Sequence, residues 1–302
     1  MRSRFVLLTL IWGASFLFIK IGVEALEPLQ VAFGRMFFGA LALLAFALVR
    51  RERLPNEPRL WGHLVVAATL ANTVPFTLFA YAERHVTSAL ASIGNATVPL
   101  FTLLFALLFF PSERPTLRRG MGLAVGFFGV LVVLGAWRGV TGSPDAPGML
   151  LILIAAACYG GSGVYMRRYL STTSYSSLAL STGQIGVGAL QLAVVLPFAT
   201  KMPTHVPLKV IASVFALGAF GTGIAYVLCY ALIRIAGATL TSTVTYFIPI
   251  VSIVIGVVGL GEQLAWNAPV GAAVIIAGAV LSRDQSPIAF MTSRLARRPS
   301  NS

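Results

Sequence analysis

The chain has 302 residues, of which 57% are hydrophobic and 10% are charged, and its formal net charge is +13. A soluble domain carries about 25% charged residues, so this composition excludes an ordinary water-soluble enzyme, a disordered chain and a nucleic-acid-binding protein. The mean hydropathy of +0.87 indicates a protein embedded in a lipid bilayer. Nucleic acid is therefore not an expected partner. The positions of the Lys and Arg residues instead indicate which side of the membrane each loop lies on.

Apolar runs of membrane-spanning length follow one another along the whole chain. About 20 apolar residues are needed to cross a hydrocarbon core of roughly 30 Å, and these runs lack the two-residue alternation of barrel strands. The expected fold is therefore an all-α integral membrane protein with ten transmembrane helices. The expected spans are 5–25, 29–49, 61–82, 87–110, 117–137, 149–166, 175–197, 209–232, 238–259 and 266–282.

The first span follows Arg2 and Arg4 and therefore resembles a signal sequence in its charge. Its apolar run is longer than that of a signal peptide, and Lys20 and Glu24 stand where a small-residue cleavage site would lie. We expect this span to be a retained helix.

The distribution of Lys and Arg predicts the orientation. Ten spans place both termini on one side of the membrane. If the N-terminus is cytoplasmic, the inner segments hold 16 of the 22 Lys and Arg residues and the outer loops hold four: Arg84, Arg138, Lys201 and Lys209. This bias predicts cytoplasmic N and C termini, in a multi-pass protein of the cell (inner or plasma) membrane. The basic tail, 285–302, is expected to be disordered and attracted to anionic lipid.

The chain resembles itself at a shift of 147–150 residues. Residues 12–15 match 159–162, and Pro99 matches Pro249. The predicted units are a first repeat at 1–141 and a second at 142–284. Because each repeat holds five spans, an odd number, the second repeat is inverted relative to the first. Inverted repeats are typical of secondary transporters, in which they let a central site face each side in turn.

Pro99 and Pro249 lie inside spans at matching positions. Proline removes one helical hydrogen bond and clashes with the preceding turn, so both helices are expected to break or kink and to free the carbonyl groups of residues 95 and 245. Paired broken helices point to a transport site. The alternative is a static kink that only shapes packing.

Several features together resemble one known family. They are Trp12-Gly13-Ala14-Ser15-Phe16, Arg35 after Pro28, Pro99 followed by Glu113, and glycine-rich fifth and tenth spans. The chain resembles an EamA-type transporter of the drug/metabolite transporter superfamily. The resemblance implies that the first, third, fourth, sixth, eighth and ninth helices surround a cavity, with the fifth and tenth outside. Gln184 stands where Arg35 stands in the first repeat, so the repeats need not contribute equally.

Polar and aromatic residues inside the spans are the candidates for a substrate path, because polar groups within a membrane tend to face the bundle interior. For each Ser or Thr, the alternative is a hydrogen bond to the carbonyl one turn earlier; for each aromatic ring, it is packing. The candidates are Trp12, Ser15, Phe16, Arg35, Thr73, Phe76, Tyr81, Asn95, Pro99, Tyr159, Ser162, Gln184, Thr222, Tyr226, Tyr230, Thr245, Tyr246 and Pro249.

Two charges lie within the spans. Lys20 is expected to extend to the lipid headgroups, or else to pair with Glu24. Arg35 has a substrate carboxylate, Glu24 or Glu27 as candidate partners. Since no Asp or Glu lies in the middle of a span, no proton carrier is expected; Glu262, like Glu113, is expected to cap a helix or lie in a loop.

The predicted function is a secondary transporter, an exporter of small organic metabolites such as amino acids that works by alternating access. The chain has no P-loop and no metal-binding or hydrolase motif, so we expect no catalytic residue, no metal and no cofactor, and the protein is not expected to be an enzyme. The alternatives are a non-transporting scaffold and a carrier of a lipid-linked or nucleotide sugar. Gly122-x-x-x-Gly126 predicts close helix packing, within the chain or in a homodimer.

Overall fold

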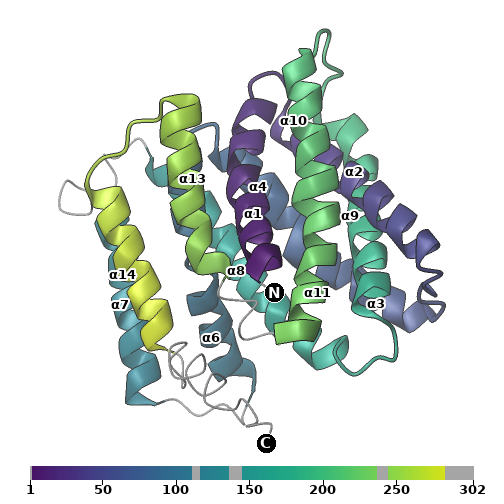
Figure 1. Cartoon of the computed structure of the whole chain (residues 1–302), viewed down its shortest axis with the longest axis horizontal. Coiled ribbons are helices and arrows are strands. Elements are labelled where there is room, and N and C mark those ends of the chain that lie inside the picture. Colours follow the sequence, from purple (N-terminus) through teal and green to yellow (C-terminus); the bar gives the residue numbers. More distant parts are fainter. Residues whose placement is uncertain (1, 111–115, 136–144, 237–243, 283–302) are drawn as a thin grey trace, which may run out of the picture.

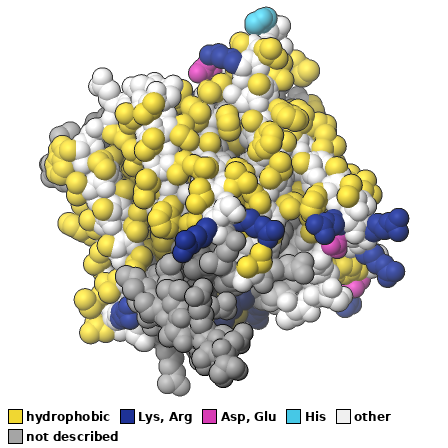
Figure 2. All heavy atoms as spheres, viewed as in Figure 1, with side chains coloured by type: hydrophobic (Ala, Val, Ile, Leu, Met, Phe, Trp, Pro, Cys, Tyr) yellow, Lys and Arg dark blue, Asp and Glu magenta, His cyan; other side chains and the backbone are white. Residues whose placement is uncertain are grey.

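The computed structural model of the chain describes residues 2–110, 116–135, 145–236 and 244–282 (Figure 1). Every regular element in these ranges is a helix, which confirms the all-helical prediction. Hydrophobic side chains cover the middle of the face shown in Figure 2, and most of the Lys and Arg side chains gather below them. This distribution is typical of a protein whose helices cross a membrane.

The first repeat contains a composite third span and a composite fourth span. The third runs without interruption through two α-helices and a π-helical segment, and the fourth is divided at Ala96 and Thr97. The helices are α1 (Arg2–Gly22), α2 (Pro28–Val49), α3 (Pro58–Ala68), η1 (Thr69–Thr73), α4 (Val74–Ala82), α5 (Ser88–Asn95), α6 (Val98–Phe109) and α7 (Leu117–Leu134).

The second repeat follows the same order, and its eighth span also contains a π-helical segment. The helices are α8 (Ala146–Tyr169), α9 (Ser177–Ala199), α10 (Leu208–Gly218), η4 (Ala219–Ile224), α11 (Ala225–Ala236), α13 (Val244–Leu260) and α14 (Asn267–Leu281).

Eight helical stretches of the described residues are long and apolar enough to cross a membrane. The helices α13 and α14 are shorter, with 17 and 15 residues, and the predicted ninth span begins in 238–243, outside the described residues. The count of ten spans and the cytoplasmic location of the termini therefore stay predictions. The tail, 285–302, also lies outside the described residues.

Side-chain caps fix where several helices begin. In each, a hydroxyl oxygen before the helix accepts a hydrogen bond from the backbone N–H three residues later. Thr87 accepts from Leu90 N, and Ser176 accepts from Ala179 N. These bonds satisfy N–H groups that have no partner within the helix. At the other end, Gly135 adopts a φ of 61°, a left-handed conformation that favours glycine and terminates α7.

The two glycine-rich helices, α7 and α14, lie side by side at one edge of the bundle (Figure 1). A Cβ atom on Gly278 would lie 2.3 Å from the backbone nitrogen of Gly126, and one on Gly271 would lie 2.4 Å from Val133 Cγ2. The absence of side chains therefore lets the two backbones touch. The close packing predicted from Gly122-x-x-x-Gly126 occurs within the chain, and a homodimer stays a prediction.

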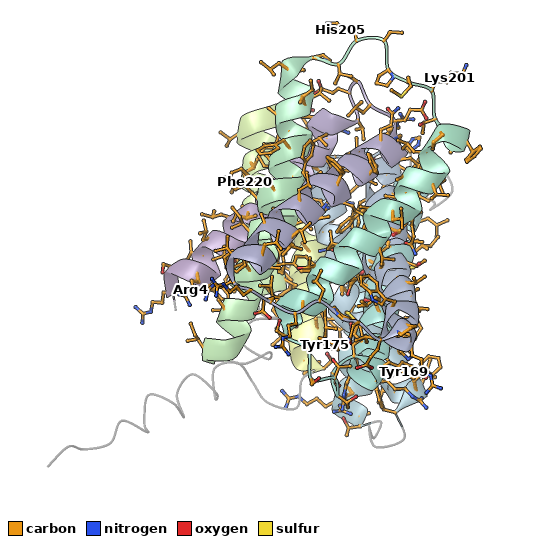
Figure 3. The ribbon with its side chains drawn as sticks, turned by 90° about the vertical axis from the view of Figure 1, so that its right-hand side faces the viewer. Arg4, Tyr169, Tyr175, Lys201, His205 and Phe220 are labelled. Atoms are coloured by element: carbon orange, nitrogen blue, oxygen red, sulfur yellow. The ribbon has the colours of Figure 1, made fainter. Side chains whose placement is uncertain are left out.

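The connections alternate between two ends of the bundle. Lys201 and His205, between α9 and α10, lie at one end of the bundle. Tyr169, the last residue of α8, and Tyr175, between α8 and α9, lie at the other (Figure 3). We name these the Lys201 end and the Tyr169 end. The α1–α2 connection is at the Lys201 end, because Glu24 pairs there with Lys209.

Candidate substrate cavity

A cavity of about 300 Å³ lies between the two repeats. Helices of both repeats line it, whereas α7, α9 and α14 contribute no residue to its wall. This arrangement matches the expectation that the fifth and tenth spans lie outside. The wall consists of Trp12, Ser15, Phe16, Ile19, Arg35, Phe76, Phe79, Asn95, Val98, Tyr159, Ser162, Gly163, Met166, Tyr226, Thr245 and Ile248.

Much of this wall is built from equivalent positions of the two repeats. Residues 12, 15, 16 and 19 of α1 line the cavity, and so do residues 159, 162, 163 and 166 of α8, each offset by 147 residues. Asn95 and Val98 likewise correspond to Thr245 and Ile248 at an offset of 150. The cavity therefore has an approximate internal symmetry, and Arg35 breaks it, since its counterpart Gln184 does not line the wall.

Arg35 is held by both repeats. Its Nε donates a hydrogen bond to Thr222 Oγ1 at 3.2 Å, and its guanidinium carbon lies 3.7 Å from the centre of the Phe76 ring. The predicted partners Glu24 and Glu27 are engaged elsewhere: Glu24 pairs with Lys209, and Glu27 accepts from Lys201 N. Arg35 therefore faces the cavity beside an aromatic ring rather than a carboxylate.

Two π-helical segments at matching places supply polar groups behind the wall. Asn72 of η1 donates to the Tyr226 hydroxyl at 3.2 Å and accepts from Gln184 Nε2 at 2.5 Å. Thr222 of η4 accepts from Arg35. Asn72 and Thr222 are both fully buried. A π-helical segment has a wider turn than an α-helix and occurs often at functional sites. Asn72 and Thr222 therefore stand at positions that a regular α-helix would not give them.

The serine hydroxyls in the wall bond within their own helices. Ser15 donates to the carbonyl of Ile11 at 2.9 Å, and Ser162 donates to that of Tyr159 at 2.7 Å. This is the alternative that the sequence left open for a hydroxyl inside a span. Both side chains nevertheless line the cavity, where their oxygens can still accept a hydrogen bond from a ligand.

The matching prolines have different effects. Ala96 and Thr97 form a turn between α5 and α6, and Pro99 stands at the start of α6, where its missing N–H is not needed. In contrast, α13 continues through Pro249. The expected break therefore lies directly before Pro99, whereas the described part of α13 runs through Pro249 without a break, and the alternative expectation there, a kink, stays a prediction.

The remaining candidates lie outside the wall. Thr73 donates to Gln191 Oε1 at 2.6 Å, Tyr81 is 37% exposed, and Tyr246 and Gln184 are buried behind the cavity. The side chain of Tyr230 lies outside the described residues.

Sequence reasoning missed part of the wall: Ile19, Phe79, Val98, Gly163, Met166 and Ile248. A signal for several of them was present, because Ile19 and Met166 continue the one-face periodicity of α1 and α8. Apolar residues at this spacing usually pack in a core, so the periodicity alone does not separate a cavity wall from packing.

Lys20 does not extend to the headgroups or pair with Glu24, so that prediction is wrong. Its Nζ donates to the carbonyl oxygens of Glu83 and Val86, at 2.6 and 2.8 Å. These carbonyls follow the end of α4, where helix carbonyls lack partners and a cation is favourable. Buried carbonyl acceptors therefore hold Lys20 more effectively than lipid headgroups would.

Glu262 caps a helix, as expected. Its carboxylate accepts from Ser88 N at 2.7 Å and from Ala89 N at 3.1 Å, at the start of α5. Ser252 Oγ donates to the Ser88 carbonyl at 3.2 Å. We name Lys20, Glu83, Ser88, Ser252 and Glu262 the end cluster; it joins the second repeat to the first near the Lys201 end of the bundle.

Glu83 was not predicted to matter, because it stands in a connection between spans. Its side chain is fully buried, and neither carboxylate oxygen has a hydrogen-bond partner among the described residues. Burial raises the pKa of Glu83 well above its usual range, and the nearby positive charge of Lys20 opposes this. Within the described ranges, no group of three His, Cys, Asp or Glu side chains could hold a metal ion.

Comparison with known proteins shows which family this chain belongs to. The EamA-like transporter family matches residues 4–135 and 146–283. The "Uncharacterized inner membrane transporter YedA" of Escherichia coli (strain K12) is 29% identical over 274 residues, which cover 91% of this chain and 87% of that protein. The "Uncharacterized transporter YoaV" of Bacillus subtilis (strain 168) is 24% identical, covering 89% and 92%. A solved crystal structure at 21% identity covers 98% of both chains with a TM-score of 0.67, which supports the fold.

The chain is thus a multi-pass membrane transporter of the EamA type in the cell membrane, as its family and its relatives indicate. It belongs to the EamA-like transporter family, whose two matched segments correspond to the two repeats.

Proposed function

We propose that this protein is a secondary transporter that exports small organic metabolites such as amino acids by alternating access. One observation carries the proposal: the cavity wall is formed by equivalent residues of two repeats, such as Trp12 with Tyr159 and Asn95 with Thr245. Two repeats of opposite orientation can exchange conformations, and a site between them then faces each side of the membrane in turn.

The chemistry of the wall favours a zwitterionic or amphipathic solute. Arg35 can bind a carboxylate through guanidinium N–H groups other than the Nε used by Thr222. Trp12 and Tyr159 offer ring faces that attract an ammonium group, and Asn95 offers both a donor and an acceptor. A solute with both charges, such as an amino acid, satisfies all of these groups.

A carrier of nucleotide sugars or lipid-linked sugars is less well supported. Such a solute brings phosphate groups, whose recognition requires several Lys or Arg side chains. Arg35 is the one Lys or Arg side chain in the described cavity wall.

The proposal is tested first by finding a substrate. Cells that overexpress the protein are screened for resistance to toxic amino acid analogues, and compounds that score are tested for their effect on the melting temperature of the purified protein. We expect a carboxylate-bearing compound to raise the melting temperature of the wild type and of Arg50→Gln, whose side chain is exposed, but not of Arg35→Gln. Equal stabilisation of Arg35→Gln would contradict the assigned role of Arg35.

The scaffold alternative is tested with the same cells. A non-transporting scaffold predicts no resistance to any analogue and no change in metabolite efflux on overexpression, whereas the transport proposal predicts both.

A further inference from the structure

Glu83 is a buried acid in the connection between α4 and α5. It directly follows α4, one helical turn beyond Phe79 of the cavity wall. It has no exposed surface, and both carboxylate oxygens lack a hydrogen-bond partner among the described residues. An ionised carboxylate in such surroundings is strongly disfavoured, and the group binds a proton instead.

The charged groups around Glu83 do not supply a partner for its carboxylate. Lys20 of α1 is nearby, but its Nζ donates to two backbone carbonyls. Arg35 of α2 acts on Glu83 more weakly, after Lys20 and Glu262. The carboxylate of Glu262, after α13, is negative and therefore disfavours a second negative charge on Glu83.

The remaining titratable groups at this place lie on the same connection and on α8. Arg84 and His85 follow Glu83 directly. Asp145 precedes α8, whose Gly148 packs against Val86 and His85. None of these side chains forms a hydrogen bond with the Glu83 carboxylate.

We propose that Glu83 is a proton-binding site that couples opening of the end cluster to proton release. In the closed arrangement Glu83 is neutral and holds a proton taken from water. When the contacts of Lys20 and Glu262 with the first repeat separate, water reaches the carboxylate and the proton returns to water. The inference rests on the proposed transport function, because opening of this end is one half of alternating access.

The site belongs to one end of the bundle. The position equivalent to Glu83 in the second repeat, at an offset of 149 residues, is Leu232, which is fully buried and apolar. At this equivalent position, opening of the opposite end therefore has no acid to deprotonate, and on the described residues the two half-cycles differ in proton binding. A difference of this kind is what links a proton gradient to the direction of transport.

The first experiment detects the proton itself. Infrared spectra of the purified protein in liposomes are recorded from pH 5 to pH 9. We expect a carbonyl stretch of a protonated carboxylic acid at neutral pH that is absent from Glu83→Gln and present in Glu57→Gln, whose exposed side chain caps nothing. A wild-type spectrum without this band at neutral pH, or a band unchanged in Glu83→Gln, would overturn the proposal.

The second experiment measures opening. Cys158 and Cys229 are replaced by alanine, and Ile19→Cys, a buried position beside Lys20 in the cavity wall, reports access to a membrane-impermeant maleimide in sealed vesicles. A separate His205→Cys variant identifies the face that carries the Lys201 end. Because the thiolate is the species that reacts with maleimide, the rate at residue 19 is divided by the rate at residue 205 at the same pH, which removes the pH dependence of the thiol itself. From this face we expect the normalised rate to rise by about tenfold per pH unit over part of the range, because opening releases one proton.

Glu83→Gln is the decisive variant for opening, because its neutral amide resembles the protonated acid. Its normalised labelling rate should be low and independent of pH, whereas Glu57→Gln should behave as the wild type does. Labelling of Glu83→Gln with unchanged pH dependence would refute the coupling. If Glu83→Gln does not fold, the wild type alone tests the proposal, and a normalised labelling rate that does not change with pH would contradict it.

Neither experiment uses a transported solute. Their failure would leave the proposed export of metabolites untouched, and failure to find a substrate would leave the protonation result standing.

Discussion

Arg35 Nε of the first repeat lies 3.2 Å from Thr222 Oγ1 of the second repeat. The donor is on α2, and the acceptor is in the π-helical segment η4, where it is fully buried. Through this bond, a residue of the second repeat helps to hold the position of the cation in the cavity wall. A relative movement of the repeats therefore changes how Arg35 is presented to a solute.

Replacing the acceptor should destabilise this arrangement. Thr222→Val keeps the shape but leaves the Arg35 Nε–H without its partner, and hydrogen bonds to charged groups contribute about 1.5–3 kcal/mol. We expect a lower melting temperature for Thr222→Val and little change for Thr222→Ser, which keeps the hydroxyl. A Thr222→Val protein that melts as the wild type does would show that the bond is not formed.

Asn72 of the first repeat should couple two residues of the second repeat, Gln184 and Tyr226, because it is hydrogen-bonded to both. In a double-mutant cycle with Gln184→Ala and Tyr226→Phe, each change removes one bond to the same amide. We expect a coupling of about 0.5–3 kcal/mol in the free energy of unfolding. The cycle repeated in Asn72→Ala should give a coupling near zero, and strict additivity in the wild-type background would argue against the relay.

The contact between α7 and α14 should not tolerate a methyl group. In Gly278→Ala the new Cβ meets the backbone of Gly126 at 2.3 Å, and backbone can move away only by shifting a helix. We expect a loss of about 1–3 kcal/mol of stability. Gly120→Ala in α7 is the matched control, since its Cβ would have no neighbour within 4 Å. Equal melting temperatures for both variants would contradict the packing.

Glu83 should make stability depend on pH. Because burial raises the pKa of Glu83 in the folded protein, the folded state keeps its proton at pH values at which the unfolded chain has lost it. This contribution is complete below the unfolded-state pKa, near 4.5, and is lost as the pH rises through the folded-state pKa. Asp145, whose pKa burial also raises, contributes with the same sign.

Melting temperatures measured across this pH range check the prediction. The decline with rising pH should be smaller in Glu83→Gln than in the wild type. An equal decline in both would mean that other groups cause it.

The sequence predicts the helical fold, because apolar length depends on neighbouring residues alone, and it predicts much of the cavity wall, because polar side chains inside a span tend to face the bundle interior. Trp12, Asn95 and Tyr159 were found in this way. The sequence does not reveal the π-helical segments that carry Asn72 and Thr222, because the apolar pattern of these spans is that of an ordinary α-helix. Glu83 was missed because a residue between two spans usually faces water, whereas here the connection folds inward beneath Lys20.

The central claim is that a solute passes through the cavity between the repeats and is bound there by Arg35. The most direct test is uptake of radiolabelled amino acids into proteoliposomes that contain the wild type, Arg35→Gln or the exposed-site control Arg50→Gln. We predict saturable uptake of at least one amino acid by the wild type and the control, and a loss of about tenfold or more in Arg35→Gln, as expected when a charge-assisted bond is removed. Uptake by Arg35→Gln that equals that of the wild type would contradict this account.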